Sequence, residues 1–218
     1  AELINVYRVI KNNVEELINR LKQHEERHSK QYFYEVRHWD RLSEYRLLSE
    51  VERAARIIYL NRTCFNGLYR VNSKGQFNVP FGRYQHPQIV NEPVLRAAHD
   101  YLSTNQVTML NVDFEEAVHG AKKGDFVYLD PPYDPISVTS SFTSYNLDGF
   151  TREDQVRLKE LFVDLDQRGV HVLLSNSATD FILDLYRDYR VEIVTANRAI
   201  NSKAEGRGKS AEVLVRNW

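Results

Sequence analysis

The sequence has a single cysteine and no long apolar run. Because only Cys64 is present among 218 residues, no disulfide can form within the chain, which fits a reducing compartment. There is no run of 18 apolar residues and no apolar N-terminal segment, so neither a membrane span nor a signal peptide is predicted. The seven histidines are scattered, without the spacing of a zinc site. These absences predict a cytoplasmic protein with no metal and no membrane partner.

Acidic residues are missing from one long stretch. No Asp or Glu occurs in the 39 residues from Arg53 to Asn91, where the average acidic content of the chain predicts about five. The basic residues of this stretch are Arg53, Arg56, Arg62, Arg70, Lys74 and Arg83. The net charge of the whole chain is only −1, so the prediction of a surface that faces a polyanion depends on this distribution.

A short apolar run ends abruptly in the middle of the chain. Phe126–Leu129 has the length and composition of a buried strand, and the segment Asp130-Pro131-Pro132-Tyr133 follows it. Proline lacks an N–H and holds the preceding residue in extended geometry, so Asp130 is expected at the carboxyl end of the strand. Ligands bind at that edge in open α/β sheets. A carboxylate, two proline carbonyls without neighbouring N–H groups and an aromatic ring are therefore expected in one small space.

These groups suit the alkylation of an exocyclic amine on a nucleobase. The lone pair of such an amine is delocalised into the ring, so the amine is a poor nucleophile. The Asp130 carboxylate and the Pro131 carbonyl can accept its two hydrogens, which favours a more tetrahedral and more nucleophilic nitrogen. Tyr133 offers a face for a base that has left the stack. The alternative is a strand followed by a rigid turn, with Tyr133 as ordinary packing.

Hydrophobic periodicity predicts alternating helices and strands. Helices are predicted at 3–21, 44–60, 92–102, 151–168 and 178–188, and strands at 107–110, 126–129, 170–174, 191–195 and 211–215. This alternation favours an α/β fold with a mainly parallel sheet. Two β-prone pieces, 68–72 and 76–79, predict a hairpin with Ser73-Lys74-Gly75 at its tip. A hairpin with a basic tip can be placed against a DNA groove.

Several motifs in one order resemble the Dam-type, alpha-group DNA adenine-N6 methyltransferases. The motifs are residues 61–72, residues 76–84, Asp130-Pro131-Pro132-Tyr133, Phe142-Thr143-Ser144-Tyr145, Phe150-Thr151, Asp154-Gln155 and Ser175-Asn176. The resemblance implies a Rossmann-like methyltransferase sheet with an inserted helical and β-hairpin DNA-recognition region. It implies a helix of the catalytic domain at 1–29, a recognition insertion at 30–104 with its hairpin at 66–82, and the catalytic domain at 105–218.

The resemblance also implies an activity and site residues. The activity is methyl transfer from S-adenosylmethionine to adenine in double-stranded DNA at a GATC-like site, in restriction-modification, in a prokaryotic cell or a phage-infected host. The catalytic motif is matched by Asp130, Pro131, Pro132 and Tyr133. Asp130 and Asp113 match cofactor contacts, although an N-cap explains Asp113 equally well. Phe142 and Tyr145 are candidates for the base pocket, with loop packing as the alternative.

DNA contacts are implied for the hairpin region. The matching residues are Asn66, Leu68, Arg70, Lys74, Pro80 and Arg83. Arg70 is suited to a bidentate contact with guanine O6 and N7, whereas a phosphate contact or a surface ion pair is its alternative. Phe65 and Tyr69 are expected to pack the hairpin rather than to intercalate.

One part of the family pattern is missing. Members open with a strand and a Phe-x-Gly-x-Gly loop that holds S-adenosylmethionine, but among nine glycines only Gly206 and Gly208 have this spacing, in a polar loop near the C-terminus. The resemblance therefore predicts a fragment that lacks the N-terminal segment. Two alternatives stay open: a DNA-binding fragment without turnover, and an RNA methyltransferase. The hairpin argues against RNA, because A-form RNA hides its major groove from such an element.

Overall fold

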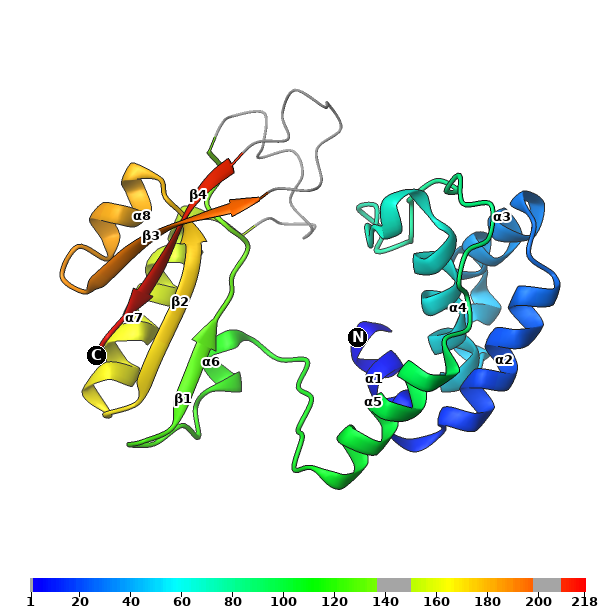
Figure 1. Cartoon of the computed structure of the whole chain (residues 1–218), viewed down its shortest axis with the longest axis horizontal. Helices are drawn as coiled ribbons and strands as arrows, with labels where there is room; N and C mark the ends of the chain where they lie inside the picture. Colours follow the sequence, from blue (N-terminus) through cyan, green and yellow to red (C-terminus); the bar gives the residue numbers. More distant parts are fainter. Residues whose placement is uncertain (1, 137–149, 198–208) are drawn as a thin grey trace. The chain divides into compact units, whose positions relative to one another are not determined.

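A computed structural model describes residues 2–136, 150–197 and 209–218 (Figure 1). The chain divides into two compact units, Ala1–Asn111 and Val112–Trp218, and each has its own hydrophobic core. Residues 1–29 belong to the first unit by their contacts. The functional domain boundaries predicted from the resemblance stay predictions. None of the helices in the described part of the chain is long and apolar enough to cross a membrane.

The first unit is built from helices. They are α1 (Glu2–Asn12), α2 (Val14–Glu26), α3 (Lys30–His38), α4 (Glu50–Thr63) and α5 (Glu92–Thr104), with the 3₁₀ turns η1 (Trp39–Arg41), η2 (Ser43–Leu47) and η3 (Phe65–Gly67). The single helix predicted at 3–21 is wrong, because Asn13 leaves helical geometry with φ −139° and ψ 39°. The helix predicted at 44–60 begins later, because Ser49 and Glu52 form a capping box that fixes its start.

The hairpin predicted after α4 is confirmed. Val71 pairs with Phe77 in an antiparallel bridge. At the tip, the side chain of Asn72 accepts two backbone N–H groups at 3.0 Å, and Gly75 takes a φ of +73° that other residues rarely adopt. The turn therefore follows from the local chemistry of asparagine and glycine.

A buried histidine, His24 of α2, lies among the aromatic residues of the first core. Its ring stacks on Tyr59 with centroids 4.9 Å apart, and its Nδ1 lies 2.8 Å from the Tyr32 hydroxyl. Burial lowers the pKa of His24 from 6.5 to about 4, and the charges of Arg20 and Arg27 act in the same direction. His24 is therefore held neutral in the folded protein.

We expect the first unit to lose stability as the pH falls from 6.5 towards 4. The pKa of His24 is lower in the folded state, so its contribution is present above pH 6.5 and is lost as the unfolded state takes up the proton. The free energy of unfolding should fall by on the order of 2 kcal/mol over this window. Urea melts followed by circular dichroism measure the loss, and His24→Gln should reduce it. An undiminished loss in His24→Gln would assign the effect to other groups.

The second unit contains a four-stranded mixed sheet covered by helices. The strands β1 (Phe126–Leu129), β2 (His171–Ser177), β3 (Arg190–Asn197) and β4 (Lys209–Arg216) lie in the order β1-β2-β4-β3. Only β1 and β2 are parallel, whereas β4 is antiparallel to both of its neighbours. The prediction of a mainly parallel sheet is thus wrong for the described strands. β3 and β4 have no described helix between them, and such neighbours can pair antiparallel without a helical crossover.

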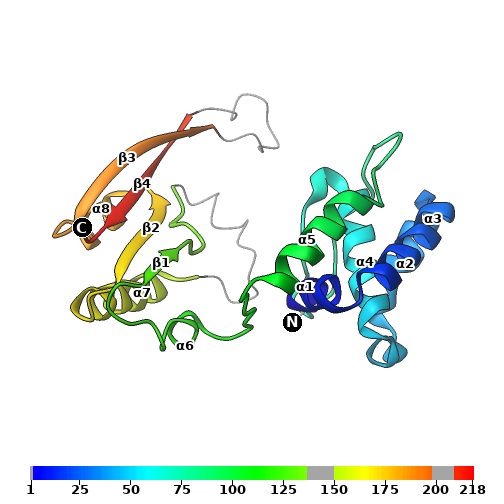
Figure 2. The same cartoon turned by 60° about the horizontal axis from the view of Figure 1, so that its bottom comes forward.

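The helices of this unit are α6 (Phe114–Ala117), α7 (Arg152–Gln167) and α8 (Asp180–Leu185). Helix α7 packs on β2, as Figure 2 shows, and buries Phe162 in the second core. Its start is fixed by a capping box between Thr151 and Asp154.

Two strand predictions need correction. β1 is half exposed rather than buried, because it is the edge strand of the described sheet and turns Phe126 and Tyr128, 58% and 52% exposed, to the same face. The strand predicted at 107–110 is absent. Val107 and Met109 pack against the first core, and no described strand pairs with this segment.

Candidate active site and hairpin surface

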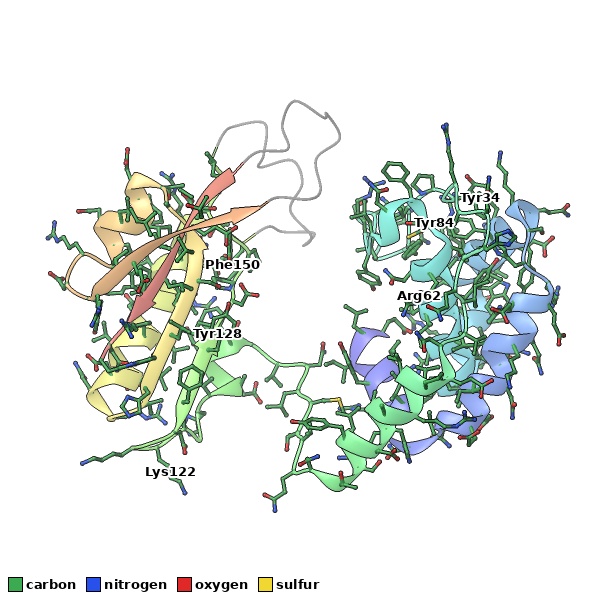
Figure 3. The ribbon with its side chains drawn as sticks, viewed as in Figure 1. Tyr34, Arg62, Tyr84, Lys122, Tyr128 and Phe150 are labelled. Carbon is green, nitrogen blue, oxygen red and sulfur yellow. The ribbon has the colours of Figure 1, made fainter. Side chains whose placement is uncertain are left out.

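Asp130 lies at the carboxyl end of β1, as predicted. Leu129 pairs with Leu174 in the parallel register, which brings Asp130 beside Ser175 of β2. The buried Ser175 hydroxyl donates to Asp130 Oδ1 at 2.8 Å and lies 2.8 Å from the hydroxyl of Tyr128, which Figure 3 labels on β1. No described residue bonds to Asp130 Oδ2. One oxygen of the exposed carboxylate is therefore held by Ser175, and the other has no partner among the described residues.

The two proline carbonyls differ. The Pro132 carbonyl accepts from Gln155 Nε2 of α7 at 2.9 Å, so the prediction that both carbonyls are unpaired is wrong for Pro132. No described residue donates to the Pro131 carbonyl. Asp130 and Pro131 thus remain as a pair of adjacent acceptors, which is the arrangement proposed for binding an amine.

Buried hydrogen bonds fix the backbone that follows Tyr133. Asp134 is only 2% exposed, and its backbone amide donates to Asn176 Oδ1 at 2.9 Å. Its carboxylate accepts hydrogen bonds from Thr179 at 2.8 Å and from Arg152 at 3.2 and 3.3 Å. Burial raises the pKa of Tyr133, so its hydroxyl stays protonated. The ring is therefore attached to a segment that three other elements hold.

Asp113 serves as the N-cap of α6, which was one of its two predicted roles. Its Oδ1 accepts from the Glu115 amide at 3.1 Å and from Arg157 Nη2 of α7 at 3.0 Å. Its side chain is half exposed. No hydrogen bond or ion pair joins Asp113 to Asp130 within the described ranges, so a cofactor contact for Asp113 stays a prediction.

The basic residues of the acid-free stretch do not all reach the surface. Arg53 pairs with Glu2 at 3.1 Å, and Arg56, 1% exposed, pairs with Asp40 at 2.8 Å. The remaining four, Arg62, Arg70, Lys74 and Arg83, are exposed, and none forms an ion pair with another described residue. Figure 3 labels Arg62 on α4. The predicted polyanion-facing surface is therefore smaller than the sequence suggested.

Arg70 is oriented by its partner strand. Its Nε donates to Asn78 Oδ1 at 2.8 Å, across the hairpin. Lys74 stands exposed at the tip. Asn66 is also exposed and takes a φ of +53°, whereas Leu68 packs partly against the first core.

The aromatic residues at the hairpin base behave differently from each other. Tyr69 packs on Phe77 with ring centroids 6.0 Å apart, as predicted. Phe65 is 48% exposed, so it stays a prediction that this residue packs the hairpin rather than intercalates. Its backbone N–H donates at 2.9 Å to the carbonyl of the exposed Pro80, which fixes the position of its backbone.

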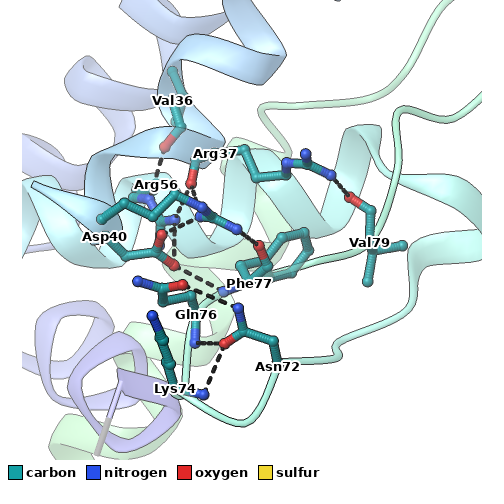
Figure 4. A network of polar contacts seen from close by, with 10 residues as sticks. Val36, Arg37, Asp40, Arg56, Asn72, Lys74, Gln76, Phe77 and Val79 are labelled. Atoms are coloured by element: carbon teal, nitrogen blue, oxygen red, sulfur yellow. Dashed lines mark hydrogen bonds and ion pairs between the residues drawn. The ribbon is translucent and has the colours of Figure 1, made fainter.

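A partly buried network ties the hairpin to the helices (Figure 4). Asp40 Oδ2 accepts from the Phe77 amide at 2.8 Å and from Arg56 at 2.8 Å, and Arg37 donates to the Val79 carbonyl at 3.1 Å. Sequence reasoning missed this network, because Asp40, the carboxylate that neutralises Arg56, lies outside the acid-free stretch.

Some predicted residues cannot be placed. Phe142, Tyr145, Gly206 and Gly208 lie outside the described residues. Within residues 2–136, 150–197 and 209–218, no group of three His, Cys, Asp or Glu side chains is placed to hold a metal ion.

A mixed α/β sheet with an Asp-Pro-Pro-Tyr segment at the end of one strand is the arrangement expected of an enzyme that methylates an amino group of a nucleobase. The profile of the D12 class N6 adenine-specific DNA methyltransferases matches residues 1–200. The chain is 49% identical over 218 residues to the type II methyltransferase M1.LlaDCHI of Lactococcus lactis subsp. cremoris, with all of this chain and 77% of that protein covered.

Two further relatives agree. The type II methyltransferase M.MjaIII of Methanocaldococcus jannaschii is 41% identical over 226 residues, covering 100% of this chain and 77% of its own. The DNA adenine methylase of Vibrio cholerae is 34% identical over 217 residues, covering 98% and 76%. The chain belongs to the D12 class N6 adenine-specific DNA methyltransferase family, which confirms the Dam-type resemblance of the sequence.

Proposed function

We propose that the chain transfers a methyl group from S-adenosylmethionine to N6 of adenine in duplex DNA, at a GATC-like site. The observation that carries this proposal is the pair of acceptors at the end of β1, Asp130 Oδ2 and the Pro131 carbonyl, to which no described residue donates, with Tyr133 two residues further along the chain. The type II names of two relatives support a place in restriction-modification.

In this proposal the target adenine leaves the stack and lies on Tyr133. Asp130 and the Pro131 carbonyl accept one hydrogen each from N6, which draws its lone pair out of conjugation and directs it at the methyl group. The N–C bond would form as the bond between the methyl carbon and the sulfonium sulfur breaks, which leaves a neutral thioether and makes N6 positive. The Asp130 carboxylate would stabilise that positive charge, and it lies on the path by which one N6 proton then leaves to water. Because Ser175 holds Oδ1, the carboxylate meets the amine in a fixed orientation.

The residues present fit part of the cofactor. S-adenosylmethionine supplies an electrophilic methyl group on a sulfonium, and it carries an ammonium group at its methionine end. The carboxylates of Asp130 and Asp113 are complementary to positive and hydrogen-donating groups. Asp113 would use Oδ2, because its Oδ1 is engaged by Glu115 and Arg157.

Methyl incorporation into duplexes tests the function. We expect N6-methyladenine in a duplex that contains GATC and none when adenine is replaced by an analogue without the exocyclic amine. A matching RNA duplex should not be methylated. Binding of the DNA without methyl incorporation would show that the chain binds DNA but does not catalyse the transfer. Methyl incorporation into cytosine would contradict adenine as the target base.

The four exposed basic residues are proposed to face DNA, with Arg70 reading a base. Nε of Arg70 donates to Asn78 Oδ1 at 2.8 Å, and one Nη2 hydrogen makes a long contact of 3.5 Å with the Asn78 carbonyl. Nη1 and the second hydrogen of Nη2 are therefore proposed to make the bidentate contact to guanine. We expect Arg70→Ala to reduce discrimination at one base pair by about 1–3 kcal/mol. Methylation rates on single-base variants of GATC measure this effect.

Lys74→Ala is the matched control at the hairpin tip. It should weaken binding to all sequences alike and lower the slope of log K against log salt by about 1. If Arg70→Ala lowered the methylation rate equally on all sites, Arg70 would contact a phosphate and not read a base.

A further inference from the structure

Two buried amide side chains lie behind the Asp-Pro-Pro-Tyr segment. Gln155 of α7 is 1% exposed and Asn176 of β2 is 0% exposed. Gln155 Nε2 donates to the Pro132 carbonyl at 2.9 Å, Asn176 Nδ2 donates to Gln155 Oε1 at 3.0 Å, and Asn176 Oδ1 accepts from the Asp134 amide at 2.9 Å. The two amides therefore bond to the backbone immediately before and immediately after Tyr133.

We propose that Gln155 and Asn176 are positioning residues for methyl transfer, which fix Tyr133 and decide which proline carbonyl binds the target amine. This inference rests on the proposed function. By pairing the Pro132 carbonyl, Gln155 leaves the Pro131 carbonyl as the acceptor that works with Asp130. Both side chains are buried, so they act through the segment and not by touching the base.

The direction of these hydrogen bonds is set by the backbone. Asn176 Oδ1 faces two N–H groups, of Asp134 at 2.9 Å and of Ser177 at 2.8 Å, so its Nδ2 must face Gln155. Gln155 must then present Oε1 to Asn176 and Nε2 to Pro132. The order of donors in this series of hydrogen bonds therefore follows from the positions of the Asp134 and Ser177 backbone amides.

The order matters for the reaction because transfer needs a fixed geometry. If the Pro132 carbonyl were unpaired, the peptide plane between Pro132 and Tyr133 could rotate about ψ of Pro132, whose φ is locked by its ring, and the Tyr133 ring would move with it. A misplacement of about 1 Å can cost ~100-fold in rate without loss of binding. Gln155 and Asn176 should accordingly affect kcat more than affinity.

Gln155→Glu is the sharpest test. The side chain keeps its shape and its acceptor for Asn176, but the ionised carboxylate has no N–H for Pro132 and repels that carbonyl. We expect kcat to fall about tenfold or more, with the Kd for DNA and the KM for S-adenosylmethionine changed less than about threefold. Protonation of the carboxyl restores the donor, so the ratio of the variant kcat to the wild-type kcat should rise as the pH is lowered from about 8 to about 5.5.

Asn176→Asp tests the other half of the pair. The new carboxylate still accepts from Asp134 and Ser177, but it cannot donate to Gln155. The Gln155 amide should turn over to donate to it, which places Oε1 against the Pro132 carbonyl. A loss of kcat similar to that of Gln155→Glu is expected. Gln167→Glu, at the exposed end of α7, is the control and should keep the wild-type kcat.

Different results would contradict the positioning role of Gln155 and Asn176 and the proposed methyltransferase function. Wild-type kcat in Gln155→Glu and Asn176→Asp would overturn the inference, and so would a loss of kcat in Gln155→Glu that the pH does not reverse. If Asn176→Asp does not fold, as shown by its thermal melt, the pH profile of Gln155→Glu decides. Absence of adenine methylation by the wild-type chain would instead refute the proposed function.

Discussion

Replacing Asp130 by alanine should abolish methyl transfer and leave duplex binding close to that of the wild type. One of the two acceptors for the amine is then missing, and so is the negative charge that faces the developing positive nitrogen. The expected loss is on the order of 3 kcal/mol or more of transition-state stabilisation, or at least about a hundredfold in rate. Single-turnover methyl incorporation measures the rate, and a gel-shift titration measures DNA binding.

Asp130→Asn sharpens this test, because it keeps the size of the side chain. Its amide oxygen can still accept from Ser175, so its NH₂ group would face the target amine with hydrogens instead of a lone pair. We expect this variant to be as inactive as Asp130→Ala. Because Asp130 is also proposed to bind the cofactor, the KM for S-adenosylmethionine should rise in both. Full activity in either variant would show that methyl transfer does not need the Asp130 carboxylate.

The features that the sequence predicted correctly depend on local chemistry. The proline pair after Leu129 places Asp130 at a strand end whatever the rest of the fold does, because proline ends a ladder and extends its neighbour. The hairpin tip follows from Asn72 and Gly75, which are close in the chain. In both cases the residues that determine the structure lie within a few positions of it.

The features that were missed depend on distant partners. The direction of β4 depends on its position between β2 and β3, which periodicity does not show. Gln155 lies on a helix 23 residues further along the chain and donates to the Pro132 carbonyl. Asp154-Gln155 was recognised as a family motif, but this hydrogen bond was not predicted. The distribution of charges predicted Arg56 at the surface. In the structure Arg56 is buried, because the Asp40 carboxylate neutralises its charge.

The same pair of residues should give the largest change in stability. Arg56 is 1% exposed and the Asp40 side chain 10% exposed, and Asp40 also accepts from the Phe77 amide of the hairpin. Asp40→Asn preserves the shape but leaves Arg56 buried without a counter-charge. Breaking a buried pair costs about 3–5 kcal/mol. We expect the lower end of that range, because Arg56 keeps its hydrogen bonds to the carbonyls of Val36 and Arg37.

Urea unfolding followed by circular dichroism of the helices measures this loss. Asp184→Asn is the matched control, because its ion pair with Arg187 is exposed on both sides, and it should change the free energy of unfolding by less than about 1 kcal/mol. Combining Asp40→Leu with Arg56→Met removes both charges and should recover much of the stability. The recovery should be incomplete, because leucine at position 40 offers no acceptor for the Phe77 amide. A loss below about 1 kcal/mol in Asp40→Asn would show that Arg56 does not need its counter-charge.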